Sequence, residues 1–117
     1  MIGPEQREAL RERLEARLTE VDAALGRSAD AVRPVSLDQT SVGRLSRMDA
    51  LQQQAMRLGL REGLARERRR VEAALARIEA GAYGKCCACG EDLSTERLHA
   101  DPAAPFCVAC ELEVSSR

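Results

Sequence analysis

The sequence predicts a mainly α-helical protein, with an antiparallel two-helix coiled-coil finger, a small cysteine-containing head and a short C-terminal helix. Apolar residues recur at steps of three and four along most of the first 80 of the 117 residues. One Phe, one Tyr and no Trp leave the chain without the large side chains of most globular cores. All five cysteines lie between residues 86 and 110. We therefore expect a helical hairpin over residues 1–80, with its turn near residues 30–43, and a head over residues 81–117.

The first helix is expected to begin near Pro4. Proline is tolerated in the first turn of a helix, and Glu5 and Glu8 suit the positive end of the helix dipole. The apolar residues that follow have nearly the 3.5-residue period of a coiled coil; they are Leu10, Leu14, Leu18, Val21 and Leu25. Gly26 weakens this helix, and Pro34 ends it or holds a turn.

The second helix is expected to start near residues 38–41, where Asp38 or Ser41 could cap it, and to continue to about Ala80. Its apolar stripe consists of Leu45, Met56, Leu60, Leu64, Val71, Leu75 and Ile78. The stretch GAYG stops it. Gly59 and Gly63 lie one turn apart, which indicates either close approach of the partner helix or a local bend. Two such helices, when a short turn joins them, form an antiparallel hairpin. The longer second helix is expected to extend beyond the first.

The cysteines have the spacing of a structural zinc site. Cys86 and Cys89 form one Cys-x2-Cys pair, Cys107 and Cys110 form another, and 17 residues lie between the pairs. Each pair can aim two thiolates at one tetrahedral Zn²⁺, and a head this small needs metal binding to fold. Free buried thiols or a redox pair are the alternatives. A zinc ion held by four sulfur atoms has no open position for catalysis.

Two other residues of the segment could bind metal. Cys87 lies between two predicted ligands and is expected to point away from the ion. His99 could replace a cysteine as a ligand, but with four sulfur atoms available it is interpreted as a surface or packing residue.

The segment GAYGKCCACGEDLSTERLHADPAAPFCVAC closely resembles the zinc finger of the DksA/TraR family of bacterial transcription factors. The shared features are Tyr-Gly before the first cysteine pair, Arg-Leu and Ala-x-Pro between the pairs, and Cys-x2-Cys at the end. The resemblance extends, less specifically, to the preceding hairpin and to the C-terminal helix implied by CELEVSSR. It implies a factor without enzymatic activity, which we expect to be a monomer. Such a factor binds RNA polymerase through the secondary channel with its coiled-coil tip and modulates initiation. In some relatives guanosine tetraphosphate binds between factor and polymerase as an effector. A cytoplasmic location is expected separately, because the sequence has neither an apolar run long enough to span a bilayer nor a basic and apolar signal segment after Met1.

The tip of the finger departs from the family pattern. Longer family members carry Asp-x-x-Asp-x-Ala between the two helices. Asp38 matches the first acid, whereas position 41 is Ser and position 43 is Gly; Asp49 offers another acid nearby. The polar groups expected to contact polymerase are Asp38, Thr40, Ser41, Arg44, Ser46 and Asp49. Helix capping alone would also account for Asp38 and Ser41.

Charge restricts the other functions that the chain could have. Its 18 basic and 19 acidic side chains give a formal net charge of -1, which makes no general case for binding nucleic acid or an anionic membrane. The basic run at residues 66–70 alternates with glutamates, so a solvated face is favoured over a phosphate site. The acidic cysteine segment argues against a DNA-binding finger, and we expect no sequence-specific DNA binding.

Three alternatives to a polymerase factor are compatible with a small helical protein of this kind. The first is a zinc-stabilised helical adaptor that docks on another protein. The second is a nucleic-acid-binding finger, and the third is a thiol oxidoreductase, which would need an exposed reactive thiolate.

Overall fold

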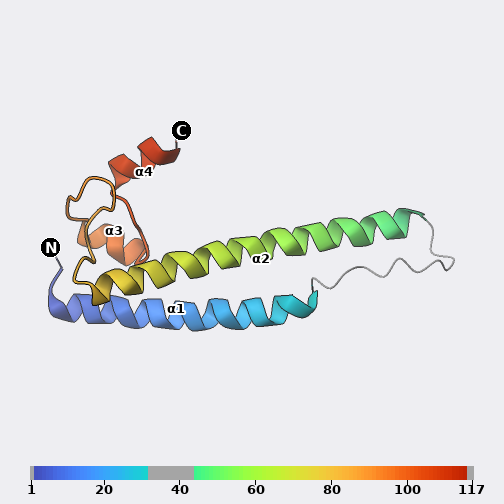
Figure 1. Cartoon of the computed structure of the whole chain (residues 1–117), viewed down its shortest axis with the longest axis horizontal. Coiled ribbons are helices and arrows are strands. Elements are labelled where there is room, and N and C mark those ends of the chain that lie inside the picture. The colour runs from blue at the N-terminus through green and yellow to red at the C-terminus, as the bar shows by residue number, and fades with distance from the viewer. Residues whose placement is uncertain (1, 32–43, 116–117) are drawn as a thin grey trace.

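The computed structural model describes the backbone of residues 2–31 and 44–115, and the side chains of residues 2–27 and 47–115. The helices are α1 (Pro4–Ala31), α2 (Arg44–Glu79), α3 (Thr95–Ala100) and α4 (Val108–Ser115). Figure 1 shows α1 and α2 side by side as a long finger, with α3, α4 and the loops between them gathered at the end where the chain begins. The molecule measures 64 × 31 × 20 Å, and the predicted mainly helical fold is confirmed.

The bounds of the long helices follow the signals in the sequence. The first helix begins at Pro4, as expected, and the N–H of Arg7 donates to the carbonyl of Gly3 at 2.9 Å. At the other end of the hairpin, Gly81 adopts a φ of +75° and closes α2. The N–H of Gly81 donates to the carbonyl of Ile78 and that of Ala82 to the carbonyl of Arg77, which is the Schellman arrangement. The GAYG stop signal is therefore confirmed.

The apolar seam packs at the base of the finger. Leu10, Leu14 and Val21 of α1 are buried, as are Val71 and Ile78 of α2. Leu18 and Leu25 of α1 and Leu64 and Leu75 of α2 are partly buried. The seam pattern therefore marks the contact face correctly over this part of the hairpin.

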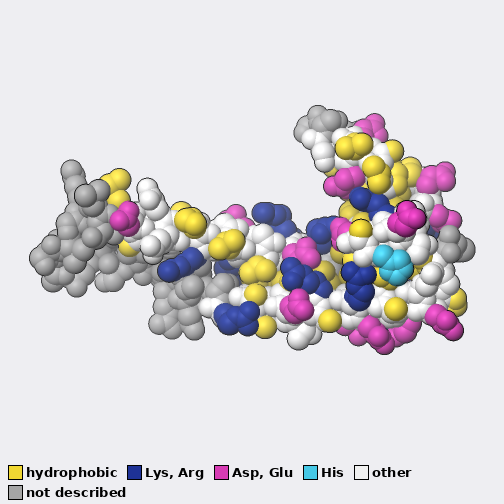
Figure 2. All heavy atoms as spheres, turned by 180° about the vertical axis from the view of Figure 1, so that it is seen from behind, with side chains coloured by type: hydrophobic (Ala, Val, Ile, Leu, Met, Phe, Trp, Pro, Cys, Tyr) yellow, Lys and Arg dark blue, Asp and Glu magenta, His cyan; other side chains and the backbone are white. Residues whose placement is uncertain are grey.

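The predicted stripe is wrong farther along α2. Met56 and Leu60 are 70% and 68% exposed, and Figure 2 shows apolar side chains open to solvent along the finger. Arg61 Nη1 donates to the carbonyl of Leu25 at 2.8 Å, which fixes the register of the two helices. At about 1.5 Å per residue, the 36 residues of α2 span about 54 Å and the 28 of α1 about 42 Å. Helix α2 thus continues beyond the described end of α1.

The two glycines of α2 do not mark a close helix contact. Among the described residues, a Cβ built on Gly59 meets nothing within 4 Å, and one built on Gly63 meets only the side chain of Arg66 at 3.8 Å. Close approach of the described part of the partner helix, one of the two explanations, is therefore excluded.

One core joins the finger to the head. Leu10 of α1 and Leu98 of α3 are fully buried, and Ala74 of α2 lies in the same cluster. The loops of the head add Tyr83, Cys86, Leu93 and Ala103. Ion pairing adds to this contact, since Arg70 Nη2 lies 2.6 Å from a carboxylate oxygen of Asp101. The head is thereby fixed against the base of α1 and α2.

Among the helices of the described part of the chain, none combines the length and apolar character needed to span a bilayer.

Candidate metal centre

The structure brings four of the five cysteines together. The sulfur atoms of Cys86, Cys89, Cys107 and Cys110 all lie within 4.8 Å of one another. Four ligands at Zn–S bonds of about 2.3 Å in a tetrahedron place sulfur atoms about 3.8 Å apart. The Cys89 and Cys107 sulfur atoms are 3.9 Å apart, close to this value. The four cysteines are therefore positioned to bind one metal ion.

Both pairs turn in the same way. The N–H of Cys89 faces the sulfur of Cys86, and the N–H of Cys110 faces the sulfur of Cys107, each at 3.5 Å. After the first pair, Gly90 has a φ of +79° and its N–H donates to the carbonyl of Cys86 at 3.0 Å. A side chain is strained at this φ, which explains why glycine follows the pair.

Backbone hydrogen bonds hold the two pairs at a fixed separation. Cys86 N–H donates to the carbonyl of Glu91 at 2.8 Å, and residues 85 and 92 form an antiparallel bridge. Cys87 N–H donates to the carbonyl of Pro105 at 2.8 Å, which links the first pair to the loop before the second. The N–H of Glu111 donates to the carbonyl of Cys107, so the first turn of α4 includes the second cysteine pair.

The four cysteines need a positive charge between them if all of their thiols are to be ionised. Burial raises the pKa of Cys86, but hydrogen bonds with the backbone of Cys89, Cys107 and Ala88 and with the Cys89 side chain together lower it to about 6. The sulfur atoms of Cys107 and Cys86 raise the pKa of Cys110, because a thiol that shares a hydrogen bond with neighbouring sulfur atoms keeps its proton. Four thiolates this close together can all be ionised only with a positive charge among them. A divalent metal ion supplies that charge.

The remaining candidate ligands lie outside the cluster. Cys87 is exposed and its sulfur is not in the group of four. His99 is also exposed, and its backbone carbonyl accepts a hydrogen bond from Arg13 at 2.9 Å. The imidazole therefore takes no part in the metal site of the described chain.

Several groups that support the site were not predicted from the sequence. The hydroxyl of Tyr83 donates to the carbonyl of Pro102 at 2.7 Å, and Arg97 Nε donates to the carbonyl of Phe106 at 2.9 Å, next to Cys107. The hydroxyl of Ser94 accepts the N–H of Arg97 at 3.0 Å and caps α3. Of these, only the cap has a local sequence signal, a serine at the start of a short helix. The other two depend on tertiary contacts.

The predicted tip residues fall mostly outside the described residues. Asp38, Thr40 and Ser41 lie in the stretch that the structure does not describe. Arg44 and Ser46 lie in the first turns of α2, and their side chains are also outside the described set. Asp49 is exposed on α2. The role of these residues therefore stays a prediction.

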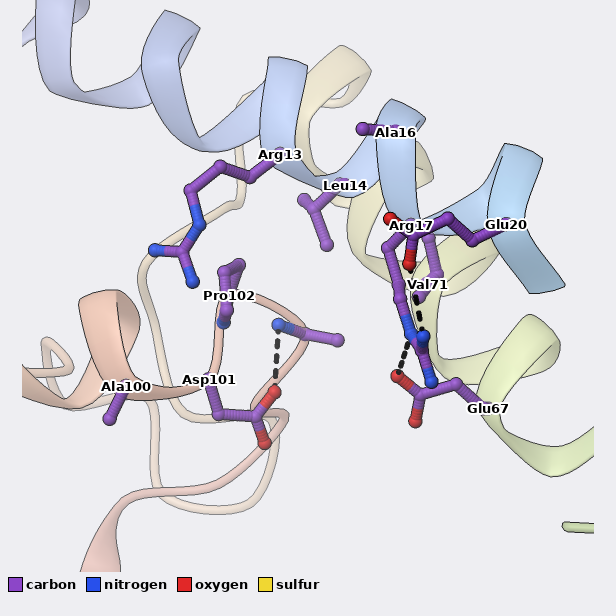
Figure 3. Close-up of a pocket in the computed structure, with 11 residues that line it drawn as sticks. Arg13, Leu14, Ala16, Arg17, Glu20, Glu67, Val71, Ala100, Asp101 and Pro102 are labelled. Carbon is purple, nitrogen blue, oxygen red and sulfur yellow. Dashed lines mark hydrogen bonds and ion pairs between the residues drawn. The ribbon is translucent and has the colours of Figure 1, made fainter. Parts of the chain in front are cut away.

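A cavity of about 420 Å³ lies between α1, α2 and residues 100–103, but its charged groups are already paired. Figure 3 shows Arg17 turned toward Glu67, with Asp101 on the facing loop. Arg17 Nε lies 3.3 Å from Glu67, and Arg13 donates to the carbonyl of His99. Because these groups satisfy one another, none of them is poised as an acid, base or nucleophile.

Comparison with known proteins agrees with the resemblance seen in the sequence. Residues 81–114 match the family model of the prokaryotic dksA/traR C4-type zinc finger. This match confirms both the family resemblance and the zinc cofactor, because the four-cysteine cluster lies inside the matched segment.

Two solved structures resemble the chain over most of its length. Transcription factor DksA2 from Pseudomonas aeruginosa has a TM-score of 0.78 at 24% identity, covering 97% of this chain and 86% of that one. DnaK suppressor protein from Agrobacterium tumefaciens C58 has a TM-score of 0.59 at 29% identity, covering 91% of both chains. The first likeness shows a shared fold.

A curated relative matches over a shorter stretch. An uncharacterized protein of Aquifex aeolicus is 44% identical over 46 residues, which is 39% of this chain. The match spans only 32% of that relative. It adds no information about activity.

Proposed function

We propose that this protein is a transcription regulator that binds RNA polymerase through the secondary channel with the tip of its finger and modulates initiation. The observation that carries the proposal is the combination of a dksA/traR-type four-cysteine finger with the full-length likeness to transcription factor DksA2. Cys86, Cys89, Cys107 and Cys110 hold a structural Zn²⁺ in this proposal. The zinc shapes the head and takes no part in a reaction.

The shape of the described chain supports such a role. A thin helical finger can enter a channel that would exclude a globular domain. Helix α2 projects beyond the described end of α1, and Asp49 is exposed on this projecting part. The finger, residues 1–80, would place Asp38, Thr40, Ser41, Arg44, Ser46 and Asp49 near the polymerase active site.

Further expected properties rest on the sequence and on the resemblance. We expect the protein to act as a monomer in the cytoplasm, to lack catalytic activity and to bind no specific DNA sequence. An effector such as guanosine tetraphosphate would bind between the protein and polymerase, and so would require both.

A generic adaptor that docks on another protein is the second candidate. Its supporting observation is the row of exposed apolar side chains on α2, at Met48, Leu51, Met56, Leu58 and Leu60. An adaptor would use these helix faces rather than the tip. Asp38→Asn therefore separates the two candidates: a polymerase factor loses activity with unchanged stability, whereas an adaptor keeps its activity.

Photo-crosslinking provides the direct test. A crosslinking residue at Gln39 is expected to attach to the active-site region of the large subunits of purified bacterial RNA polymerase. The same residue at Glu5, exposed in the first turn of α1, serves as the control and should not attach there. Crosslinks from Gln39 only to the outer surface of polymerase, or only to other proteins, would favour the adaptor.

A further inference from the structure

The two cysteine pairs of the metal centre are held in different ways. Cys86 of the first pair is 3% exposed and belongs to the core cluster, and an antiparallel bridge closes the loop that carries Cys86 and Cys89. Cys107 and Cys110 of the second pair are only partly buried. No residue of α4, which contains Cys110, is buried. Packing in the core therefore holds the second pair less firmly than the first.

One side chain contacts the residues on either side of the second pair. Arg97 Nε donates to the carbonyl of Phe106 at 2.9 Å, and Phe106 directly precedes Cys107. The Nη2 atom of Arg97 lies 4.0 Å from a carboxylate oxygen of Glu111, which directly follows Cys110. A guanidinium can bind two acceptors at once, because its N–H groups point in fixed directions. Arg97 therefore spans the second pair from outside.

Arg97 is itself fixed by α3. Its N–H donates to the hydroxyl of Ser94 at 3.0 Å, and its carbonyl accepts the N–H of Asp101 at 2.9 Å. The next residue, Leu98, is fully buried in the core. The side chain of Arg97 is 25% exposed, so its hydrogen bond to the Phe106 carbonyl is largely shielded from water and is stronger than a fully solvated one. Helix α3 thus gives the guanidinium a rigid base.

The charge of Arg97 also suits this position. Four thiolates around one Zn²⁺ leave negative charge that the ion does not neutralise. Between residues 85 and 115 the only lysine and arginine are Lys85 and Arg97. Arg97 places one of these two cations beside the second pair, where it partly offsets that charge.

We propose that Arg97 is a positioning residue that keeps Cys107 and Cys110 in place and thereby sets how fast the centre releases its metal. The hydrogen bond to Phe106 contributes more than the ion pair with Glu111, because that ion pair is long and the Glu111 side chain is 47% exposed. Metal release accordingly begins at the second pair. The inference rests on the metal centre and does not depend on binding to RNA polymerase.

Thiol labelling of the zinc-loaded full chain tests the order of release. The protein is mixed with a zinc chelator and N-ethylmaleimide, and the labelled cysteines are identified by mass spectrometry at successive times. Cys107 and Cys110 are expected to react before Cys86 and Cys89. Cys87 is exposed and outside the group of four, so its reaction from the start serves as the internal control. Labelling of the first pair before the second, or of all four cysteines together, would overturn the proposal.

Substitution of Arg97 tests its role in release. Arg97→Gln should lose zinc to the chelator at least severalfold faster than the parent. Arg97→Lys keeps the charge, but one ammonium lacks the fork that reaches both acceptors, so its rate should stay close to that of Arg97→Gln. Full rescue by Arg97→Lys would mean that charge alone sets the rate, contrary to the proposal.

Arg13 provides the matched control. It also donates to a carbonyl of the head, that of His99, but away from the cysteines. Arg13→Gln should therefore release zinc within about twofold of the parent rate. Equal acceleration in Arg13→Gln and Arg97→Gln would mean that the general stability of the head controls release.

NMR spectroscopy of the cadmium-loaded chain separates positioning from stability. The β-proton signals of Cys107 and Cys110, and their couplings to the metal, should change more in Arg97→Gln than those of Cys86 and Cys89. The same signals unchanged at all four cysteines would show that Arg97 does not position the ligands.

Discussion

At the scale of single residues, Cys87 and Cys107 show how position decides the role of a thiol. Cys107 belongs to the group of four sulfur atoms, whereas Cys87 is exposed and outside it. We expect Cys107→Ser to lose most of its bound zinc and the folded head, since metal binding contributes to folding. The matched control, Cys87→Ser, should keep a full equivalent of bound zinc. Metal content after purification and thermal unfolding measure both effects, and equal zinc loss in the two variants would contradict the assignment.

Tyr83 gives a pH-dependent prediction. Burial is the main cause that raises its pKa from 10.0 to about 12. The pKa of Tyr83 is higher in the folded state than in the unfolded state. The neutral phenol therefore contributes its full stabilisation to the folded protein below pH 10. That contribution is lost as the pH rises through about 12. Tyr83 is the single tyrosine and the chain has no Trp, so the absorbance of tyrosinate near 295 nm reports this residue alone.

The control for this titration is Tyr83→Phe, which removes the hydrogen bond to Pro102 and the titrating group together. It should lower the free energy of unfolding by about 1 kcal/mol near neutral pH. Its stability should also fall less steeply than that of the parent above pH 10. A parent that titrates with a midpoint near 10 would show that Tyr83 is solvated instead.

The sequence alone predicts the metal ligands, but not the ion pairs between residues far apart in the chain. The metal group was predictable because two Cys-x2-Cys pairs require only local turns to aim four sulfur atoms at one ion. The ion pair between Arg70 and Asp101 was not, because its partners are 31 residues apart and meet only when the head packs on α2.

At the scale of elements, two glycines with opposite roles allow a paired test. Gly81 ends α2 at a φ of +75°, so Gly81→Ala should destabilise the protein by about 1 kcal/mol. Gly26 lies inside α1, and a Cβ there meets nothing within 4 Å among the described residues, so Gly26→Ala should stabilise the protein by roughly 0.5–1 kcal/mol. Urea unfolding measures both changes. Destabilisation by Gly26→Ala would mean that α1 needs flexibility at this point.

Element types and stop signals were predictable because they rest on local chemistry. Pro4 at the start of α1 and the glycine at the end of α2 act through the backbone geometry of one or two residues. The exposure of Met56 and Leu60 was not predictable from periodicity alone. An apolar stripe on a helix identifies a face, but it does not identify which residues of that face contact the partner helix.

At the scale of the whole molecule, the zinc site and the finger are coupled through one core. Cys86 lies in the same cluster as Leu10 and Leu14 of α1 and Ile78 of α2. The metal therefore stabilises more than the loop that binds it. Loss of zinc should expose the face of the finger against which the head packs.

Chelation tests this coupling. Removal of zinc should unfold α3 and α4 and reduce the helical circular-dichroism signal. Methyl signals of Leu10 and Leu14, at the base of the finger, should shift strongly in NMR spectra. Those of Leu58 and Leu60, which are exposed on α2 and outside the core cluster, should change little. Readdition of Zn²⁺ should restore the spectrum, and uniform shifts along α2 would mean that the finger folds and unfolds as one unit with the head. Purified protein with less than half an equivalent of zinc and unchanged helicity in chelator would contradict a structural metal, because a cluster of four sulfur atoms without a cation would then be stable by itself.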